Sequence, residues 1–493
     1  MKNQKRNFMK IRPPIVAILG HVDHGKTTLL DFIRKSNITN REFGGITQKI
    51  GAYEITTEFK DYKTNKITFI DTPGHEAFTK LRARGANVAD IALLLIDGKD
   101  SVMPQTEESI SHIKAANIPF IVVINKIDLP ETNPDKVKND LLKYEVLTEG
   151  KGGDVPVALV SAKTGKGINE LLETILFIAS DLKLVYDEKN PVQAYIIETK
   201  KDRRGIVASV IIKDGAIKIA DTVYVNDQKI KVKSLVNDLG KNVIQVIPSN
   251  PFEMTGFNEM PEVGSMIKQQ VAVSTTTDLP AEALAKAGPL TLEDVLKVEV
   301  VEKKLPAIIK ADSQGSVEAI KNSLKDNTNL NIVLLAVGEI NKSDIFLAKA
   351  TKSIIIGFTV KTSNEAEDLA KQEKVIIKSY KIIYELLDEL NEVANLIKEK
   401  EEKEKNLKGE AKILANFIIE GEKIFGVSVI KGKLNLGDEI EAFRKNKPIG
   451  KTKLVSLKVR AKTVNEVKKG QEAGMIFGPP LDFLVGDVVK SIL

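Results

Sequence analysis

The feature that most constrains this chain is a glycine-rich run near its start, Gly20-His-Val-Asp-His-Gly25-Lys26-Thr27. The run follows a β-branched apolar stretch, residues 15–19, and precedes a helical pattern over residues 28–35. This strand–loop–helix context is the one that a P-loop requires. In a P-loop, the glycines let backbone N–H groups and a helix N-terminus surround phosphate oxygens. The sequence therefore predicts a nucleotide phosphate site in an α/β domain.

Within this loop, Lys26 is expected to place its ammonium on the β- and γ-phosphates, and the Thr27 hydroxyl to ligate Mg²⁺. We expect the whole loop to contact the nucleotide. The predicted contact residues are Gly20, His21, Val22, Asp23, His24, Gly25, Lys26, Thr27 and Thr28.

A second motif, Asp71-Thr-Pro-Gly74, follows the apolar run 67–70. The Asp71 carboxylate can hold a water of the Mg²⁺ shell, and the Gly74 N–H can meet the γ-phosphate. His75 comes next and can reach a water behind the γ-phosphate. Phosphoryl transfer needs mainly positioning and electrostatics, so an imidazole that orients this water suffices. We expect His75 to be the catalytic residue; the alternative is a surface histidine without a role.

A third motif, Asn125-Lys126-Ile127-Asp128, ends the apolar run 120–124 and predicts which base is bound. The Asp128 carboxylate only accepts hydrogen bonds, so it suits the adjacent N1–H and N2–H₂ donors of guanine. Asn125 is expected to support the loop and the base edge, and the Lys126 stem to cover the ring. In Ser161-Ala162-Lys163, the Ala162 N–H can donate to guanine O6. Alone, each motif is also typical of an ordinary strand-end turn, but together they predict GTP or GDP.

A residue that senses the γ-phosphate is expected between Lys26 and Asp71. Thr47 is the best candidate, because its hydroxyl and carbonyl can close over Mg²⁺ while glycines 44 and 45 act as a hinge. Thr39, Thr56 and Thr57 are the competing candidates. The predicted metal site is therefore Thr27, Thr47 and, through a water, Asp71.

Patterning divides the 493 residues into several folding segments. Continuous apolar runs that alternate with helices are typical of a parallel sheet covered on both faces, whereas alternating strands between turns are typical of a barrel. The predicted segments are a short basic tail (1–12), a nucleotide-binding domain (13–182), a β-barrel (190–272), a linker (273–289), an α/β/α domain (292–380), a linking helix (381–408) and a C-terminal β-barrel (411–493).

The two barrels are predicted to be copies of one type. Residues 215–223 and 432–440 share a glycine, alternating apolar residues and an aspartate in one register, and residues 261–264 and 483–486 add a second match. The linking helix is indicated by Ile383, Leu386 and later apolar residues at three- and four-residue spacing, and we expect it to run from Tyr380 to Leu407.

Composition excludes several classes of protein. Cysteine is absent, which rules out disulfides, thiolate metal sites and cysteine nucleophiles. There are only four histidines, which argues against a zinc centre built from several histidines. The net charge of +6 permits a polyanionic partner without requiring one. No stretch has the ~18 consecutive apolar residues needed to span a bilayer. The first ten residues are basic, but the apolar run 15–19 is too short for a signal peptide. We expect a cytosolic protein without a membrane partner.

The motifs resemble those of a translational GTPase, and residues 44–53 with 71–78 resemble bacterial translation initiation factor two in particular. The likeness continues through residues 309–320, 343–344 and 354–358, so it covers nearly the whole chain. The resemblance implies GTP-dependent delivery of initiator tRNA to the small ribosomal subunit, then subunit joining, with hydrolysis to GDP stimulated by the large subunit. It also implies a monomer that works with other initiation factors, with Thr47 as the switch threonine and His75 as the water-positioning residue.

By the same resemblance, the last barrel holds the acylated end of initiator tRNA. The residues carried over or offered there as tRNA contacts are Arg444, Lys458, Arg460, Lys462, Glu472 and Gly474. The alternative is that these basic residues belong to an ordinary solvated surface and bind no tRNA. This chain departs from relatives in lacking a long N-terminal extension, in Lys49 where they carry histidine, and in Val427 and Ala473 where they carry cysteines. Selectivity for formylated methionine is therefore left open.

Two other functions fit the sequence less well. An elongation-type tRNA-delivery GTPase shares the nucleotide motifs, but the α/β domain and long helix before the last barrel argue against it. An RNA-binding protein in which GTP only stabilises the fold would share the motifs without hydrolysing the nucleotide.

Overall fold

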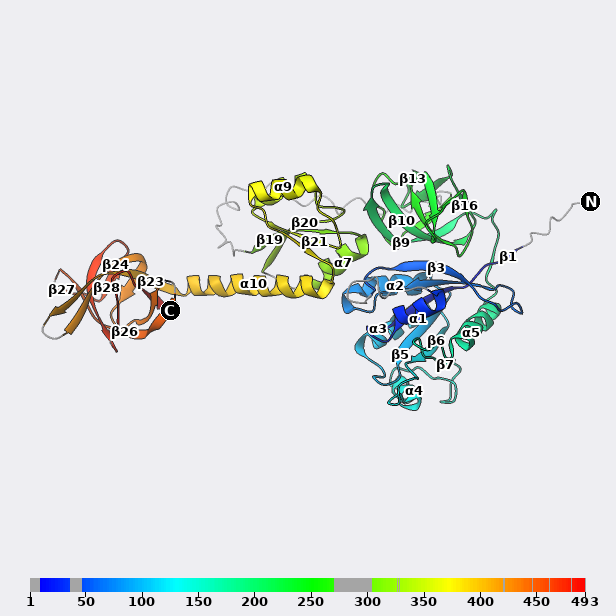
Figure 1. The fold of residues 1–493 in the computed structure, drawn as a ribbon, viewed down its shortest axis with the longest axis horizontal. Helices are drawn as coiled ribbons and strands as arrows, with labels where there is room; N and C mark the ends of the chain where they lie inside the picture. The colour runs from blue at the N-terminus through cyan, green and yellow to red at the C-terminus, as the bar shows by residue number, and fades with distance from the viewer. Residues whose placement is uncertain are drawn as a thin grey trace, which may run out of the picture. The chain divides into compact units, whose positions relative to one another are not determined.

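The computed structural model describes residues 9–35, 47–269 and 304–492, apart from residues 326, 328, 420, 421, 446, 461 and 480. Most of the predicted basic tail, the predicted linker 273–289, the start of the predicted α/β/α domain, Thr39 and the hinge glycines lie outside the described residues. The described chain forms two compact units. The first contains the described residues up to 269 and Pro306–Glu389, and the second contains residues 304–305 and the described residues from Leu390 onward. Figure 1 shows the elements of both units.

The first domain is a six-stranded sheet with helices on both faces (Figure 1). Its central strands are completely buried because each consists of consecutive apolar residues. The strand order is β3 (Gly51–Thr56), β4 (Lys66–Asp71), β2 (Ile15–Gly20), β5 (Ile91–Asp97), β6 (Phe120–Asn125) and β7 (Val157–Leu159). The helices are α1 (Lys26–Arg34), α2 (Thr79–Val88), α3 (Pro104–Ala116), α4 (Pro134–Leu142) and α5 (Ile168–Asp181).

Two details differ from the predicted parallel sheet. Strand β3 runs antiparallel to β4 at the edge of the sheet, whereas the other pairs are parallel. Helix α1 begins at Lys26, two residues earlier than expected, because Gly25 adopts a left-handed conformation (φ 91°) that ends the loop there. The carboxyl ends of β2, β4 and β6 carry the predicted motifs, so the fold brings these motifs to one edge.

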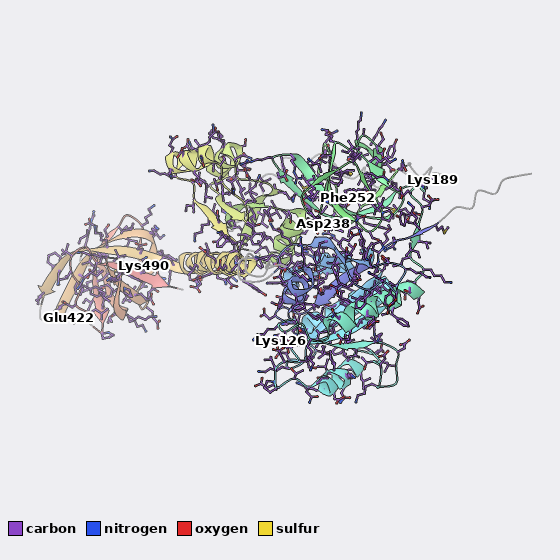
Figure 2. All side chains as sticks on the ribbon, turned by 45° about the vertical axis from the view of Figure 1, so that its right-hand side comes forward. Lys126, Lys189, Asp238, Phe252, Glu422 and Lys490 are labelled. Carbon is purple, nitrogen blue, oxygen red and sulfur yellow. The ribbon has the colours of Figure 1, made fainter. Side chains whose placement is uncertain are left out.

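The second domain is an antiparallel β-barrel with its own apolar core. Phe252 lies in this core, and Asp238, on the loop after β14, accepts the Glu54 N–H of the first domain at 3.1 Å (Figure 2). The strands are β9 (Gln193–Asp202), β10 (Gly205–Asp214), β11 (Ile217–Lys218), β12 (Thr222–Val225), β13 (Gln228–Lys231), β14 (Ser234–Asn237), β15 (Asn242–Val243), β16 (Gln245–Val246), β17 (Pro251–Thr255) and β18 (Met266–Lys268).

The third domain is a four-stranded sheet with helices packed on it. Its strand order is β20 (Leu330–Val337), β19 (Leu305–Ala311), β21 (Ile354–Phe358) and β22 (Ile377–Tyr380), and its described helices are α7 (Gln314–Ser323), α8 (Lys342–Thr351) and α9 (Asn364–Glu373). The long helix α10 (Ile383–Lys405) follows. It starts three residues later than predicted, because Tyr380 is the last residue of β22.

The second unit contains a C-terminal antiparallel barrel around another apolar core. Its strands are β23 (Leu407–Ile419), β24 (Glu422–Asn435), β25 (Glu439–Arg444), β26 (Lys447–Val459), β27 (Lys462–Thr463), β28 (Glu466–Lys468), β29 (Glu472–Gly478) and β30 (Val488–Ile492). The predicted fold class, a P-loop α/β domain with two barrels, a second α/β domain and a long helix, is confirmed. Among the described residues, no helix is both long and apolar enough to cross a membrane.

Candidate nucleotide-binding site

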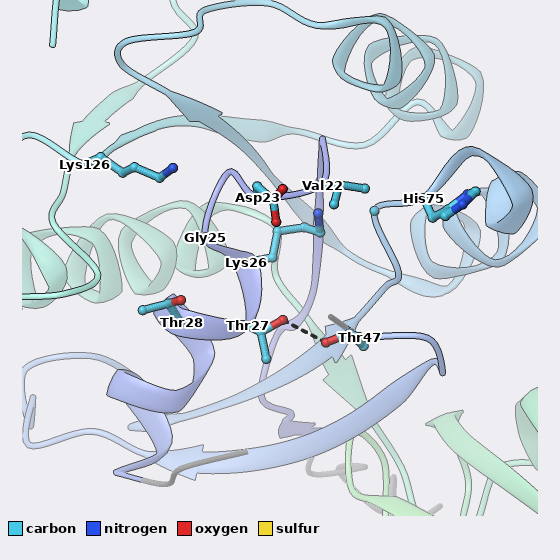
Figure 3. Close-up of a pocket in the computed structure, with 10 residues that line it drawn as sticks. Val22, Asp23, Gly25, Lys26, Thr27, Thr28, Thr47, His75 and Lys126 are labelled. Carbon is cyan, nitrogen blue, oxygen red and sulfur yellow. Dashed lines mark hydrogen bonds between the residues drawn. The ribbon is translucent and has the colours of Figure 1, made fainter. Parts of the chain in front are cut away.

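Two adjoining cavities lie at the carboxyl edge of the first sheet and share Gly25, Thr28 and Lys126. The larger, of about 260 Å³, is lined by Val22, Asp23, Gly25, Lys26, Thr27, Thr28, Thr47, Gly74, His75 and Lys126 (Figure 3). The smaller, of about 180 Å³, is lined by Gly25, Thr28, Asn125, Lys126, Asp128, Leu129, Ala162 and Lys163. The fold therefore brings together the four motifs that the sequence singles out, in the form of one elongated site.

The larger cavity is built to hold an anion. The Lys26 side chain is buried, and its Nζ donates to the carbonyl oxygens of Gly20 (3.0 Å) and His21 (2.5 Å). Burial lowers the pKa of Lys26, and the nearby Asp71 carboxylate partly offsets this effect. A Cβ at Gly74 would collide with the Lys26 ammonium, so only glycine lets this backbone approach so closely. A buried cation with few counter-charges favours a polyanionic ligand.

The three predicted metal ligands lie next to one another. The hydroxyl oxygens of Thr27 and Thr47 are 2.8 Å apart (Figure 3). The Thr47 hydroxyl also donates to Asp71 Oδ2 at 3.3 Å. All three supply oxygen, the donor that Mg²⁺ prefers. Two of the competing threonines are described, and both lie elsewhere: Thr57 bonds to the Asn65 carbonyl at 2.9 Å, and Thr56 is at the far end of β3. Thr39 is outside the described residues. The residues present therefore fit a magnesium ion.

The smaller cavity has a rigid polar floor. Asn125 is buried; its Nδ2 donates to the His24 carbonyl and its Oδ1 accepts the Ala162 N–H, each at 2.9 Å. The Ser161 hydroxyl donates to Asp128 Oδ1 at 2.7 Å, which lowers the pKa of Asp128. Ser161 therefore orients Asp128. The predicted bond from the Ala162 N–H to guanine O6 stays a prediction, because this N–H here serves Asn125.

His75 borders the phosphate cavity, but its ring is not directed at the residues that would hold the phosphates. Its side chain points away from Lys26 and Thr27 (Figure 3), and its Nδ1 accepts the Ala77 N–H at 2.9 Å. The ring is 5% exposed and stacks on the Tyr384 ring with centroids 3.9 Å apart. The water-positioning role of His75 therefore stays a prediction that requires the side chain to rotate.

Sequence reasoning missed several residues that shape the site. Arg82 is fully buried and donates to the carbonyl oxygens of Pro73 (3.0 Å) and His75 (2.5 Å), which fixes the loop after β4. Asp97 pairs with Lys126 Nζ at 2.6 Å. Asp97 ends a buried strand, as Asp71 does, so this signal was available in the sequence. The buried arginine had no comparable signal.

The other three histidines each contact neighbouring groups in the first domain. His24 is buried and its Nδ1 lies 3.2 Å from the Leu95 carbonyl oxygen; burial lowers its pKa to about 4, so it is neutral at pH 7. The His21 and His24 ring centroids are 5.0 Å apart. His112 bonds to Glu108, one turn earlier in α3, at 3.1 Å.

In the C-terminal barrel, the structure separates one predicted residue from the others. Lys458 lies opposite Gly474 in the β26–β29 register, and Lys462 lies opposite Val459 at the same end of β26. Arg460 comes directly after Val459, the last residue of β26. Glu472 is the first residue of β29 and comes two positions before Gly474.

Arg444 lies opposite Lys447 at the other end of this 13-residue strand, and Lys447 is eleven positions before Lys458. Its guanidinium makes two bonds to Asp487, of 3.0 and 2.9 Å. Arg444 therefore lies apart from Lys458 on this strand, and its role as a tRNA contact stays a prediction.

Comparisons with known proteins agree with this geometry. Residues 12–181 match the Elongation factor Tu GTP binding domain, residues 191–270 match Elongation factor G domain 2, and residues 281–391 match Translation-initiation factor 2. The GDP-bound aIF5B of Aeropyrum pernix is 25% identical and covers 98% of this chain and 92% of its own, with a TM-score of 0.46, too low to support a structural argument.

Two curated relatives are similar over nearly the whole chain. Translation initiation factor IF-2 of Bartonella henselae is 41% identical over 98% of this chain and 59% of its own length. The factor of the same name from Thermotoga sp. (strain RQ2) is also 41% identical, over 97% of this chain and 71% of its own. The chain thus spans between about three fifths and seven tenths of these relatives. On this identity, together with the matched domains and the assembled motifs, the chain belongs to the translation initiation factor IF-2 family.

Proposed function

We propose that this protein is a GTPase of translation initiation. It binds initiator (formyl)methionyl-tRNA, promotes its placement on the small ribosomal subunit and subunit joining, and hydrolyses GTP to GDP. One observation carries the nucleotide part: two adjoining cavities, with the buried ammonium of Lys26 in one and the carboxylate of Asp128 in the other. A cation for phosphates and an acceptor for guanine stand at the two ends of one site.

For the base, Asp128 accepts the N1–H and N2–H₂ of guanine, and the hydrogen bond from Ser161 orients the carboxylate and lowers its pKa. The test is calorimetric titration with GTP, GDP and xanthosine triphosphate, which has a carbonyl where guanine has its 2-amino group. Asp128→Asn should weaken GTP binding at least about tenfold and favour the xanthosine nucleotide. The matched control is Asp135→Asn, an exposed acid in the first turn of α4. An unchanged preference in Asp128→Asn would refute the assignment.

For the metal, Thr27, Thr47 and Asp71 (through water) would hold Mg²⁺. The ion supplies positive charge that neutralises the charge developing on the phosphate oxygens. Thr47 approaches Thr27 from the chain segment after residue 46, so its closure senses whether a γ-phosphate is present. Thr47→Ala should therefore weaken GTP binding more than GDP binding, and equal losses for both nucleotides would contradict this role.

For hydrolysis, His75 turns toward the γ-phosphate and orients the attacking water, while Arg82 holds the backbone of the loop. His75→Ala should lose ribosome-stimulated hydrolysis in a single-turnover assay and keep GTP binding. A variant as fast as the wild type would remove His75 from the mechanism.

For the tRNA, the C-terminal barrel offers an open patch beside the cations Lys458, Arg460 and Lys462. Gly426 lies opposite Gly474 across β24 and β29, so the surface there is backbone. Phe417, 52% exposed, borders it: a Cβ at Gly426 would lie 3.5 Å from the Phe417 ring. Apolar surface next to cations suits an acylated nucleic-acid end. Comparing formylated with unformylated initiator tRNA, with GTP and with GDP, tests this site.

The remaining partners follow from this function. The small and large ribosomal subunits and other initiation factors would bind the protein in the cytoplasm, where it would act as a monomer. Co-sedimentation with isolated subunits, with GTP and with GDP, tests these partners, and failure to bind either subunit would contradict the proposal.

A further inference from the structure

The His75 ring is held in its present orientation by three contacts. Its Nδ1 accepts the Ala77 N–H, the Phe78 ring meets it edge-on at 5.9 Å, and the Tyr384 ring stacks on it at 3.9 Å. Because Nδ1 accepts a hydrogen bond, the neutral ring carries its proton on Nε2. His75 Nε2 is buried and has no hydrogen-bond partner in the described structure. This orientation therefore has an energetic cost that packing must offset.

Tyr384 belongs to the first turn of α10, 309 positions along the chain from His75. The start of that helix is fixed by one side chain, Gln48. The Ile383 N–H donates to Gln48 Oε1 at 3.0 Å, and Gln48 Nε2 donates to the Lys381 carbonyl at 2.8 Å. Gln48 directly follows Thr47, the residue that bonds to Thr27. The next residue, Lys49, pairs with Asp312 just before α7, so this segment also contacts the third domain at a second point.

We propose that Tyr384 is a positioning residue that stacks on His75, keeps its ring turned away from Lys26 and Thr27 and so suppresses GTP hydrolysis until the first turn of α10 moves. This inference rests on the proposed GTPase function and adds how that activity is restrained. Arg82 fixes the carbonyls of Pro73 and His75, so activation needs only a rotation of the His75 side chain. Moving α10 away removes the stacking partner and leaves the unpaired Nε2 free to turn toward the phosphates.

The test is single-turnover GTP hydrolysis by the full chain without ribosomes. Tyr384→Leu keeps an apolar side chain but removes the ring, so hydrolysis should rise about three- to tenfold, the scale expected for the removal of one ring pair. Tyr384→Phe keeps the stacking ring and should restore the slow wild-type rate. Adding His75→Ala to Tyr384→Leu should abolish the rise.

A structural readout accompanies the rates. In an NMR titration of the histidine rings, Tyr384→Leu should shift the His75 resonance and raise its pKa toward the ordinary value, because burial is the main cause that lowers it. The charged neighbours Glu76 and Arg82 are unchanged in this variant, so the shift reports the removal of the ring. Tyr384→Phe should leave the titration as in the wild type.

Three results would overturn the proposal. A Tyr384→Leu protein that hydrolyses GTP no faster than the wild type would refute the restraint, and so would a rise that persists in the double variant. If His75→Ala alone hydrolyses GTP on ribosomes as fast as the wild type, the catalytic role proposed for His75 fails as well. The first two results leave that role intact, so the two failures are distinguishable.

Discussion

The two barrels of this protein close the same turn with the same hydrogen bonds. Asp221 accepts the Lys218 N–H at 2.8 Å in the first barrel, and Asp438 accepts the Asn435 N–H at 2.8 Å in the second. The residue before each aspartate has a positive φ, 70° in one barrel and 90° in the other. These matches confirm the repeat that the sequence predicts and show that both barrels are built on one scaffold.

The barrels differ in one row, a pair of opposite residues that lies across β10 and β17 in the first barrel and across the corresponding strands β24 and β29 in the second. In the first, Glu253 of β17 lies opposite Ser209, and its carboxylate is bound by Lys200 (2.5 Å) and Arg204 (2.6 Å). In the second, the same row holds two glycines, Gly426 and Gly474.

One barrel thus covers this row with ion pairs, whereas the other has only half-buried glycine backbone there, with Lys458 opposite Gly474. We call this glycine pair the open row, because it carries no side chain. We expect the shared scaffold to supply stability and the residues of this row to decide which ligand each barrel can take.

The largest expected effect concerns the shared turn. Asp438 also accepts the Ser491 hydroxyl at 3.0 Å and pairs with Lys408, and its side chain is 8% exposed. Asp438→Ala should lower the free energy of unfolding of the C-terminal barrel by about 3 kcal/mol, because it leaves a partly buried charge unpaired. The counterpart Asp221→Ala should cost only about 1 kcal/mol. Urea unfolding measures the free energy of unfolding of both variants. Equal losses would show that the extra contacts of Asp438 with Ser491 and Lys408 do not stabilise the second barrel.

The next effect tests the open row. Gly474→Glu places in the second barrel the residue that covers this row in the first, and acyl-tRNA binding should weaken at least about tenfold, because the side chain fills the open space and repels phosphates. Glu253→Gln in the first barrel is the matched control and should leave tRNA binding unchanged. Wild-type affinity in Gly474→Glu would show that the glycine row is not a ligand surface.

The local sequence was sufficient to predict which strand ends hold the candidate nucleotide-binding residues. Asp71, Asn125 and Ser161 each follow a short apolar run, and parallel strands bring their carboxyl ends to one edge. Asp128 and Thr47 were identified because their chemistry matched one part of the ligand.

Contacts between residues that are far apart in the chain leave no such pattern in the local sequence. Gln48 and Ile383 are 335 positions apart, and nothing near either residue indicates that they bond. The orientation of His75 depends on a ring from a distant helix. The same holds for Arg444: its charge is visible in the sequence, but its bonds to Asp487 depend on a strand pairing.

A smaller effect separates the cations of the second barrel. Replacing Lys458, Arg460 or Lys462 with glutamine should reduce the salt dependence of tRNA binding by about one unit of log–log slope for each cation that binds a phosphate. Arg444→Gln should leave the slope unchanged, because that guanidinium is already bound to Asp487. A slope that falls as much in Arg444→Gln would return this residue to the tRNA surface.

The smallest effect is a pH dependence. Asp487 follows Gly486, and its hydrogen bonds with Arg444 lower the pKa of its carboxyl below the ordinary 3.8. A lowered folded pKa gives stability that is complete above the unfolded pKa and is lost as the pH falls through the folded value. The counterpart in the first barrel, Ser265, accepts a neutral bond from Asn226. Asp487→Asn should therefore flatten the acid limb of the stability curve, whereas Ser265→Ala should not.

The most direct test of the central claim is single-turnover GTP hydrolysis when the large ribosomal subunit is mixed with a small-subunit complex that carries initiator tRNA and this protein. We predict a burst of phosphate release that requires both the large subunit and His75. Hydrolysis that is no faster with the complete complex than with the protein alone would contradict the assignment as an initiation GTPase.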